Sequence, residues 1–156
     1  MKQSSQKGFT LIELLIVIII LGVLASLIAG NFFTSLKKGR DARRKTDLQM
    51  IQRGLELYYE DNRTYPSSLV LNGTGQLCHP TGTCSLKVYI NKIPADPNSS
   101  CTYSYVQDSG GTGYALYSII ENDNDSGPGV DQDGYASGNC TCGECKFAVS
   151  SPNVTP

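Results

Sequence analysis

One uninterrupted apolar run constrains this 156-residue chain more than any other feature. Residues 9–29 read FTLIELLIVIIILGVLASLIA, and Glu13 carries the only charge among them. At 1.5 Å per residue a helix of this length is roughly 30 Å long, which matches the hydrocarbon thickness of a bilayer. We therefore predict a membrane-spanning helix over about residues 9–30.

The position of the run argues against an ordinary secretory signal. Such a signal has a shorter apolar region, followed by a cleavage site of small residues. Here the candidate processing point, Gly8, comes before the apolar run. We therefore expect the apolar segment to stay in the mature chain.

The start of the run resembles the prepilin peptidase site of type IV pilins and type II secretion pseudopilins. The resemblance lies in the residues Lys7-Gly8-Phe9-Thr10-Leu11-Ile12-Glu13-Leu14. It implies that residues 1–8 are a leader, that a prepilin peptidase cuts between Gly8 and Phe9, and that the new amine of Phe9 is methylated. It also implies an α+β, type IV pilin-like fold, in which a long N-terminal helical spine packs against a small antiparallel β-sheet.

Glu13 needs a partner of opposite charge. A carboxylate inside a membrane helix is disfavoured by about 2.5–3.5 kcal/mol on insertion scales, and the next basic residue is Lys37. The nearest candidate is the amine that cleavage creates at Phe9, on the same chain or on a neighbour, so Glu13 would set the register of assembly. The alternative is a glutamate that reaches the membrane interface from a simple anchor helix.

An amphipathic helix should continue the spine to about residue 60. Its predicted packing face recurs mostly at steps of three and four residues, and comprises Leu36, Leu48, Ile51, Leu55 and Tyr58. An end near Asp61 or Asn62 is expected because Pro66 forces extended backbone shortly afterwards. The basic run over residues 37–45 is predicted to be a solvated face. The alternative is that in a filament it faces neighbouring spines and pairs with Asp41, Asp47 or Glu56.

Residues 61–156 are predicted to form a globular domain. Residues 67–100 indicate a long structured loop, and residues 102–107 and 114–120 indicate a β-hairpin across a glycine-rich turn. Three or four antiparallel strands would pack on the spine. Residues 93–97 resemble the sheet entry of major pseudopilins.

All six cysteines lie in this distal region: Cys78, Cys84, Cys101, Cys140, Cys142 and Cys145. Such density favours disulfides in an oxidising compartment, which would join the last twenty residues to the sheet and to the upstream loop. Sequence does not choose among the 15 pairings. The alternative is a zinc site, since Cys142 and Cys145 have zinc-ribbon spacing.

An acidic segment over residues 121–134 contains the ligand types that calcium prefers. The candidate ligands are Asp123, Asp125, Asp131 and Asp133. Their spacing does not fit the twelve-residue calcium loop, and a soluble, flexible loop is the simpler interpretation. Resemblance to the major pseudopilins, which carry a calcium site near the C-terminus, supports Ca²⁺ as a candidate cofactor.

Composition excludes several functions. There is one histidine, His79, so no Ser-His-Asp or Cys-His arrangement with a second histidine can be drawn, and no enzyme is expected. Without residues 1–8 the chain keeps 11 basic and 14 acidic side chains, which argues against a dedicated nucleic-acid binder.

The resemblance implies a structural subunit of a type IV pilus or a type II secretion pseudopilus. Its partners would be copies of itself, other pilins, the prepilin peptidase and an inner-membrane assembly platform.

The charges after the span would place the C-terminus inside, but the peptidase site and the cysteines favour a cytoplasmic N-terminus and an extracellular or periplasmic filament. The alternative is a monomeric, membrane-anchored binding or redox domain that uses the cysteines.

Overall fold

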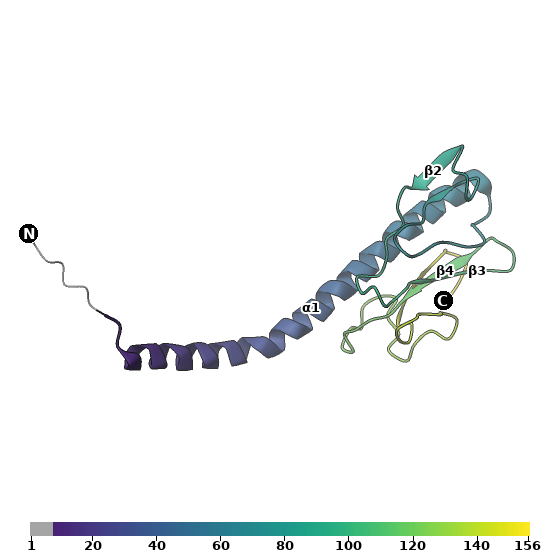
Figure 1. Cartoon of the computed structure of the whole chain (residues 1–156). Helices are drawn as coiled ribbons and strands as arrows, with labels where there is room; N and C mark the ends of the chain where they lie inside the picture. Colours follow the sequence, from purple (N-terminus) through teal and green to yellow (C-terminus); the bar gives the residue numbers. More distant parts are fainter. Residues whose placement is uncertain (1–7) are drawn as a thin grey trace, which may run out of the picture. The chain divides into compact units, whose positions relative to one another are not determined.

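The computed structural model describes residues 8–156, except for the side chains of Ala29 and Asn31. The chain divides into two compact units, Met1–Leu36 and Lys37–Pro156, and each is described by itself. Helix α1 (Leu11–Asn62) is followed by the strands β1 (Leu77–His79), β2 (Lys87–Ile90), β3 (Ser104–Gln107), β4 (Tyr114–Ser118) and β5 (Phe147–Ser150) (Figure 1). The predicted α+β class is confirmed. Residues 1–7, which hold most of the predicted leader, lie outside the described residues.

The second half of α1 supplies one wall of the core. Leu48, Ile51 and Leu55 are fully buried, and Tyr58 is nearly so. These positions follow the predicted helical spacing, because residues three and four apart share a face. Leu36 was expected on the same face, but it is 44% exposed and lies outside the core.

Helix α1 ends where the backbone turns left-handed. Arg63 has a φ of 59° and its amide donates to the carbonyl of Tyr59. The Asn62 Nδ2 donates to the carbonyl of Tyr58 at 2.8 Å, which satisfies a backbone acceptor at the helix end. The helix therefore stops at Asn62, before Pro66.

The main sheet is an antiparallel meander in the order β3-β4-β5. The predicted hairpin is confirmed: Gln107 pairs with Tyr114, and Asp108 donates to the carbonyl of Gly113 across the turn. Every residue of β4 is buried. Its alternate side chains belong to two clusters, because successive residues of a strand point to opposite faces. Tyr114 and Leu116 join the core with α1.

Two features of the sheet region were not predicted. Strand β5 comes from the cysteine-rich tail, and it pairs with β4 from Ala115 to Ser118. The predicted loop over residues 67–100 contains the two-stranded sheet β1-β2. Ile90 of β2 packs so closely over Gly54 of α1 that a side chain at Gly54 would overlap it. Strands of three and four residues are too short to show a clear alternating pattern.

Candidate assembly site

The first turn of α1 holds Glu13 in a reciprocal cap. The Thr10 amide donates to the Glu13 Oε2 at 2.9 Å, and the Thr10 hydroxyl donates to the same oxygen at 2.7 Å. The Glu13 amide donates in return to the Thr10 Oγ1 at 3.3 Å. This capping box satisfies donors that a helix start leaves free. In the unprocessed chain the Phe9 nitrogen is an amide, so its pairing with Glu13 after cleavage stays a prediction.

The large apolar side chains described in the apolar run are all exposed. Each large apolar side chain described from Phe9 to Ile28 is at least 46% exposed, and Gly8 has no neighbour within 4 Å of where a Cβ would lie. By length and composition, α1 can cross a membrane. An exposed apolar surface of this extent requires lipid or other chains to cover it.

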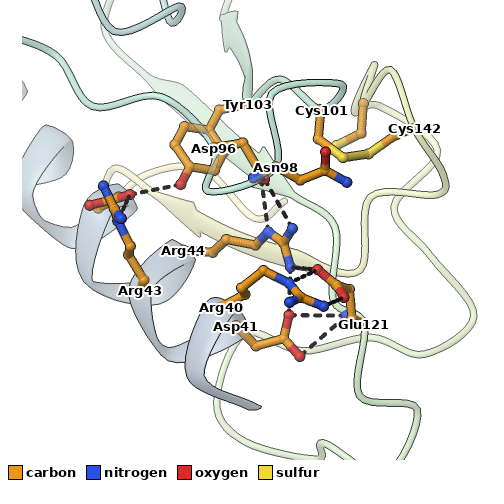
Figure 2. A network of polar contacts seen from close by, with 12 residues as sticks. Arg40, Asp41, Arg43, Arg44, Asp96, Asn98, Cys101, Tyr103, Glu121 and Cys142 are labelled. Carbon is orange, nitrogen blue, oxygen red and sulfur yellow. Dashed lines mark hydrogen bonds and ion pairs between the residues drawn. A yellow bond between two sulfur atoms is a disulfide. The ribbon is translucent and has the colours of Figure 1, made fainter. Parts of the chain in front are cut away.

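A buried guanidinium lies at the start of the second unit. Arg44 of α1 is fully buried, and its side chain lies between Asp96 and Glu121 (Figure 2). Its Nε and Nη2 donate to the two carboxylate oxygens of Asp96 at 2.8 and 2.9 Å. Its Nη1 contacts Asp41 and Glu121, both at 2.8 Å. The prediction of a solvated basic face is therefore wrong at Arg44, which pairs with Asp41 of its own chain.

This cluster joins three segments of the chain. Asp41 lies on α1, Asp96 precedes β3, and Glu121 follows β4. Asp41 also accepts the backbone amides of Glu121 and Asn122 at 2.9–3.2 Å. Hydrogen bonds on every carboxylate make such a buried charge cluster tolerable. The cluster thus fixes both loops of the sheet to the helix.

The charges in the cluster shift the pKa values of its members. The hydrogen bond from Arg40 is the main cause that lowers the pKa of Glu121, to about 2, although burial opposes it. Burial by itself would lower the pKa of Arg44, but its bonds to Asp96 and Glu121 outweigh burial and raise the pKa. Both groups therefore stay charged at neutral pH.

The acidic segment is held by lysines. The Lys45 Nζ of α1 lies 2.6 Å from the Asp125 Oδ2, and the Lys146 Nζ lies 3.5 Å from the Asp123 Oδ1. Asp131 accepts the backbone amide of Asp133 at 3.0 Å. In residues 8–156 no three His, Cys, Asp or Glu side chains gather as a metal centre would. This arrangement does not fit a calcium ion shared by the four aspartates, and the calcium site stays a prediction.

All six cysteines are paired in disulfides: Cys78–Cys84, Cys101–Cys142 and Cys140–Cys145. The second bridge joins the tail to the segment before β3, as expected for the sheet. The expected bridge from the tail to the upstream loop is wrong, because Cys78 and Cys84 pair with each other. The described structure leaves no thiol for a zinc site.

Two family matches cover most of the chain. Residues 3–29 match the prokaryotic N-terminal methylation motif. Residues 31–135 match the family described as type II secretion system (T2SS), protein G. The chain belongs to the protein G family of the type II secretion system. The tail that carries β5 and three of the cysteines lies beyond this match.

Curated relatives agree with the family. The chain is 32% identical over 139 residues to type II secretion system core protein G of Pseudomonas aeruginosa, which covers 85% of this chain and 96% of the relative. It is 35% identical over 100 residues to the core protein G of Escherichia coli K12, covering 60% of this chain and 68% of that one. No solved structure matched significantly.

Proposed function

We propose that this chain is a pseudopilin: a structural subunit that is processed after Gly8 and assembles through residues 9–36 into a type II secretion pseudopilus. The observation that carries this proposal is an apolar helix that its own chain leaves exposed, in a member of the protein G family. No chemistry is required of such a subunit. The monomeric binding or redox alternative is not favoured, because it would need neither Gly8 nor Glu13.

The proposal includes the route to the filament. The prepilin peptidase removes residues 1–8 at the cytoplasmic face, and residues 37–156 lie on the other side of the membrane. Assembly proceeds at an inner-membrane platform, with copies of this chain and other pilins as partners. Matches to the methylation motif and to protein G support these partners and this location.

Glu13 is proposed to select the register between subunits. In the precursor Thr10 holds its carboxylate within the first turn, beside the future N-terminus. Cleavage creates a positive amine at Phe9, and its attraction to Glu13 of the same or a neighbouring chain is strong in a medium of low dielectric constant.

A Glu13→Leu variant tests this role. We expect normal processing and membrane insertion, since leucine is more apolar, but a filament yield reduced at least about tenfold, as the loss of about 1.4 kcal/mol per contact would give. Intact mass analysis scores cleavage and methylation, and sheared filaments are quantified against the membrane pool. Val17→Leu, in the same exposed run, is the matched control and should assemble normally. Normal filaments from Glu13→Leu would refute the register role.

A further inference from the structure

The pattern Asn-X-Ser/Thr is unusually frequent in this chain. Six of the nine asparagines carry it: Asn62, Asn72, Asn98, Asn124, Asn139 and Asn153. Serine and threonine make up 27 of the 156 residues, so nine asparagines would meet the pattern roughly once or twice by chance. All six lie in the unit Lys37–Pro156.

This pattern is the acceptor for glycans on asparagine in chains that are exported to the cell surface. A transferring enzyme must reach the Asn Nδ2, so an acceptor has to be exposed and its Nδ2 has to be free of other bonds. The residue two positions later must also bond to the carboxamide in an Asx turn, which brings its hydroxyl close. Among these six asparagines of the described chain, only Asn72 and Asn98 accept such a bond from the residue two positions later.

Asn72 meets all of these requirements. It is exposed, and its Oδ1 accepts the backbone amide of Thr74 at 3.0 Å and the Thr74 hydroxyl at 2.6 Å. Asparagine bonded in this way to the residue two positions on forms an Asx turn. The left-handed φ of 82° at Gly73 permits the turn. In the described chain nothing bonds the Asn72 Nδ2, so the nitrogen is available while the hydroxyl is in place.

Asn98 has the same turn in a weaker form. It is exposed, and its Oδ1 accepts the backbone amide of Ser100 at 3.1 Å. Asn62 is the contrasting case, because its Nδ2 donates to the Tyr58 carbonyl at 2.8 Å and to the Tyr89 hydroxyl at 3.2 Å. Asn153 is similarly engaged, since its Nδ2 donates to the carbonyl of Thr112 at 2.9 Å.

We propose that Asn72, together with Asn98, accepts an N-linked glycan. The donor class is a membrane-anchored glycosyl diphosphate. The bond between the sugar C1 and the diphosphate oxygen breaks, a bond forms between C1 and the Asn Nδ2, the lipid diphosphate leaves, and one amide proton passes to a base of the transferring enzyme. The inference rests on the proposed function only for the location of residues 37–156 outside the cytoplasm.

Mass spectrometry of the full chain, isolated from its own cells, tests the proposal. Peptides that contain each asparagine are sequenced before and after an amidase hydrolyses the bond between asparagine and sugar in ¹⁸O-labelled water. We expect sugar mass and heavy-oxygen aspartate at Asn72 and Asn98, and an unmodified Asn62 in the same sample. Unmodified Asn72 and Asn98 would overturn the proposal.

Two variants test the role of the hydroxyl. Thr74→Val should lose the glycan at Asn72 completely and keep the one at Asn98, whereas Thr74→Ser should keep both. Thr74 is exposed, so both variants should fold, and equal melting temperatures check this. A glycan retained at Asn72 in Thr74→Val would overturn the assignment.

Filaments are counted in the same cells to separate this inference from the proposed function. Filaments built from unglycosylated chains would overturn the glycan proposal alone. Glycosylated chains that never assemble would support the glycan proposal and count against the structural role.

Discussion

The two halves of α1, residues 11–36 and 37–62, differ in burial in the opposite sense to their hydropathy. The first half is almost wholly apolar and yet exposed, while the second half is rich in charge and contains a fully buried Arg44. In this helix a side chain is buried where the same chain supplies groups that contact it, whether the side chain is polar or apolar. The partners of Arg44 lie on the same chain, at Asp41, Asp96 and Glu121, whereas those of the apolar half must come from outside.

The largest expected effect comes from breaking the buried cluster. Arg44→Met should lower the free energy of unfolding of residues 37–156 by about 3–5 kcal/mol, because it leaves Asp41 and Asp96 buried without a cation. Urea titration of the full chain in detergent, followed by amide hydrogen exchange, measures the change. Arg43→Met is the matched control: its side chain is 65% exposed and lies 3.9 Å from Asp47, so a loss under about 1 kcal/mol is expected.

A substitution in the other half of the helix completes this test. Leu21 is 58% exposed, and Leu21→Ala should change the unfolding free energy of residues 37–156 by no more than about 0.5 kcal/mol. A loss comparable to that of a core leucine would show that the apolar half packs within its own chain, and the contrast would fail.

Removing disulfides should give the next largest effect. Replacing Cys101 and Cys142 with serine should cost about 2–4 kcal/mol, at the upper end of the range, because this bridge closes a loop across a sequence separation of 41. The bridge Cys78–Cys84 spans only 6, so its loss should cost less by the same chain-entropy argument. Urea midpoints of the two double variants decide the order, and equal losses would contradict it.

The last prediction concerns acid, which should weaken the cluster through one carboxylate and have no effect at neutral pH. The pKa of Glu121 is lowered from 4.5 to about 2, chiefly by Arg40, so its stabilising contribution is present above pH 4.5 and is lost as the pH falls towards 2. The unfolding free energy of residues 37–156 should decline over this window, and Glu121→Gln should flatten the decline. An equal slope in the variant would exclude Glu121 as the cause. Amide protection of residues 14–36 should stay unchanged.

The sequence predicted the elements with long or regular patterns. The spine, its end near Asn62 and the hairpin β3-β4 follow from apolar spacing, Pro66 and a glycine-rich turn, all of which are local signals. Strands β1, β2 and β5 are short, and their pairing depends on residues distant in sequence, so no local pattern identified them.

Arg44 could have been found in the sequence. It lies four residues before Leu48 and seven before Ile51, which places it on the packing face of the helix. Its membership of a basic run concealed this position. Asp96 and Glu121 could not be linked to it, because their loops meet the helix only in the folded chain.

The placement of the tyrosines in residues 37–156 determines what the fluorescence of the chain reports. Tryptophan is absent, and all nine tyrosines lie between residues 58 and 135. The hydroxyls of Tyr65 and Tyr114 donate to Glu56 at 2.9 and 2.8 Å, and burial, followed by these bonds, raises the pKa of both phenols. A phenol bonded to a carboxylate emits weakly, and its emission returns on unfolding. The tyrosine fluorescence of this subunit therefore reports on residues 37–156 alone, even in a bilayer or a filament.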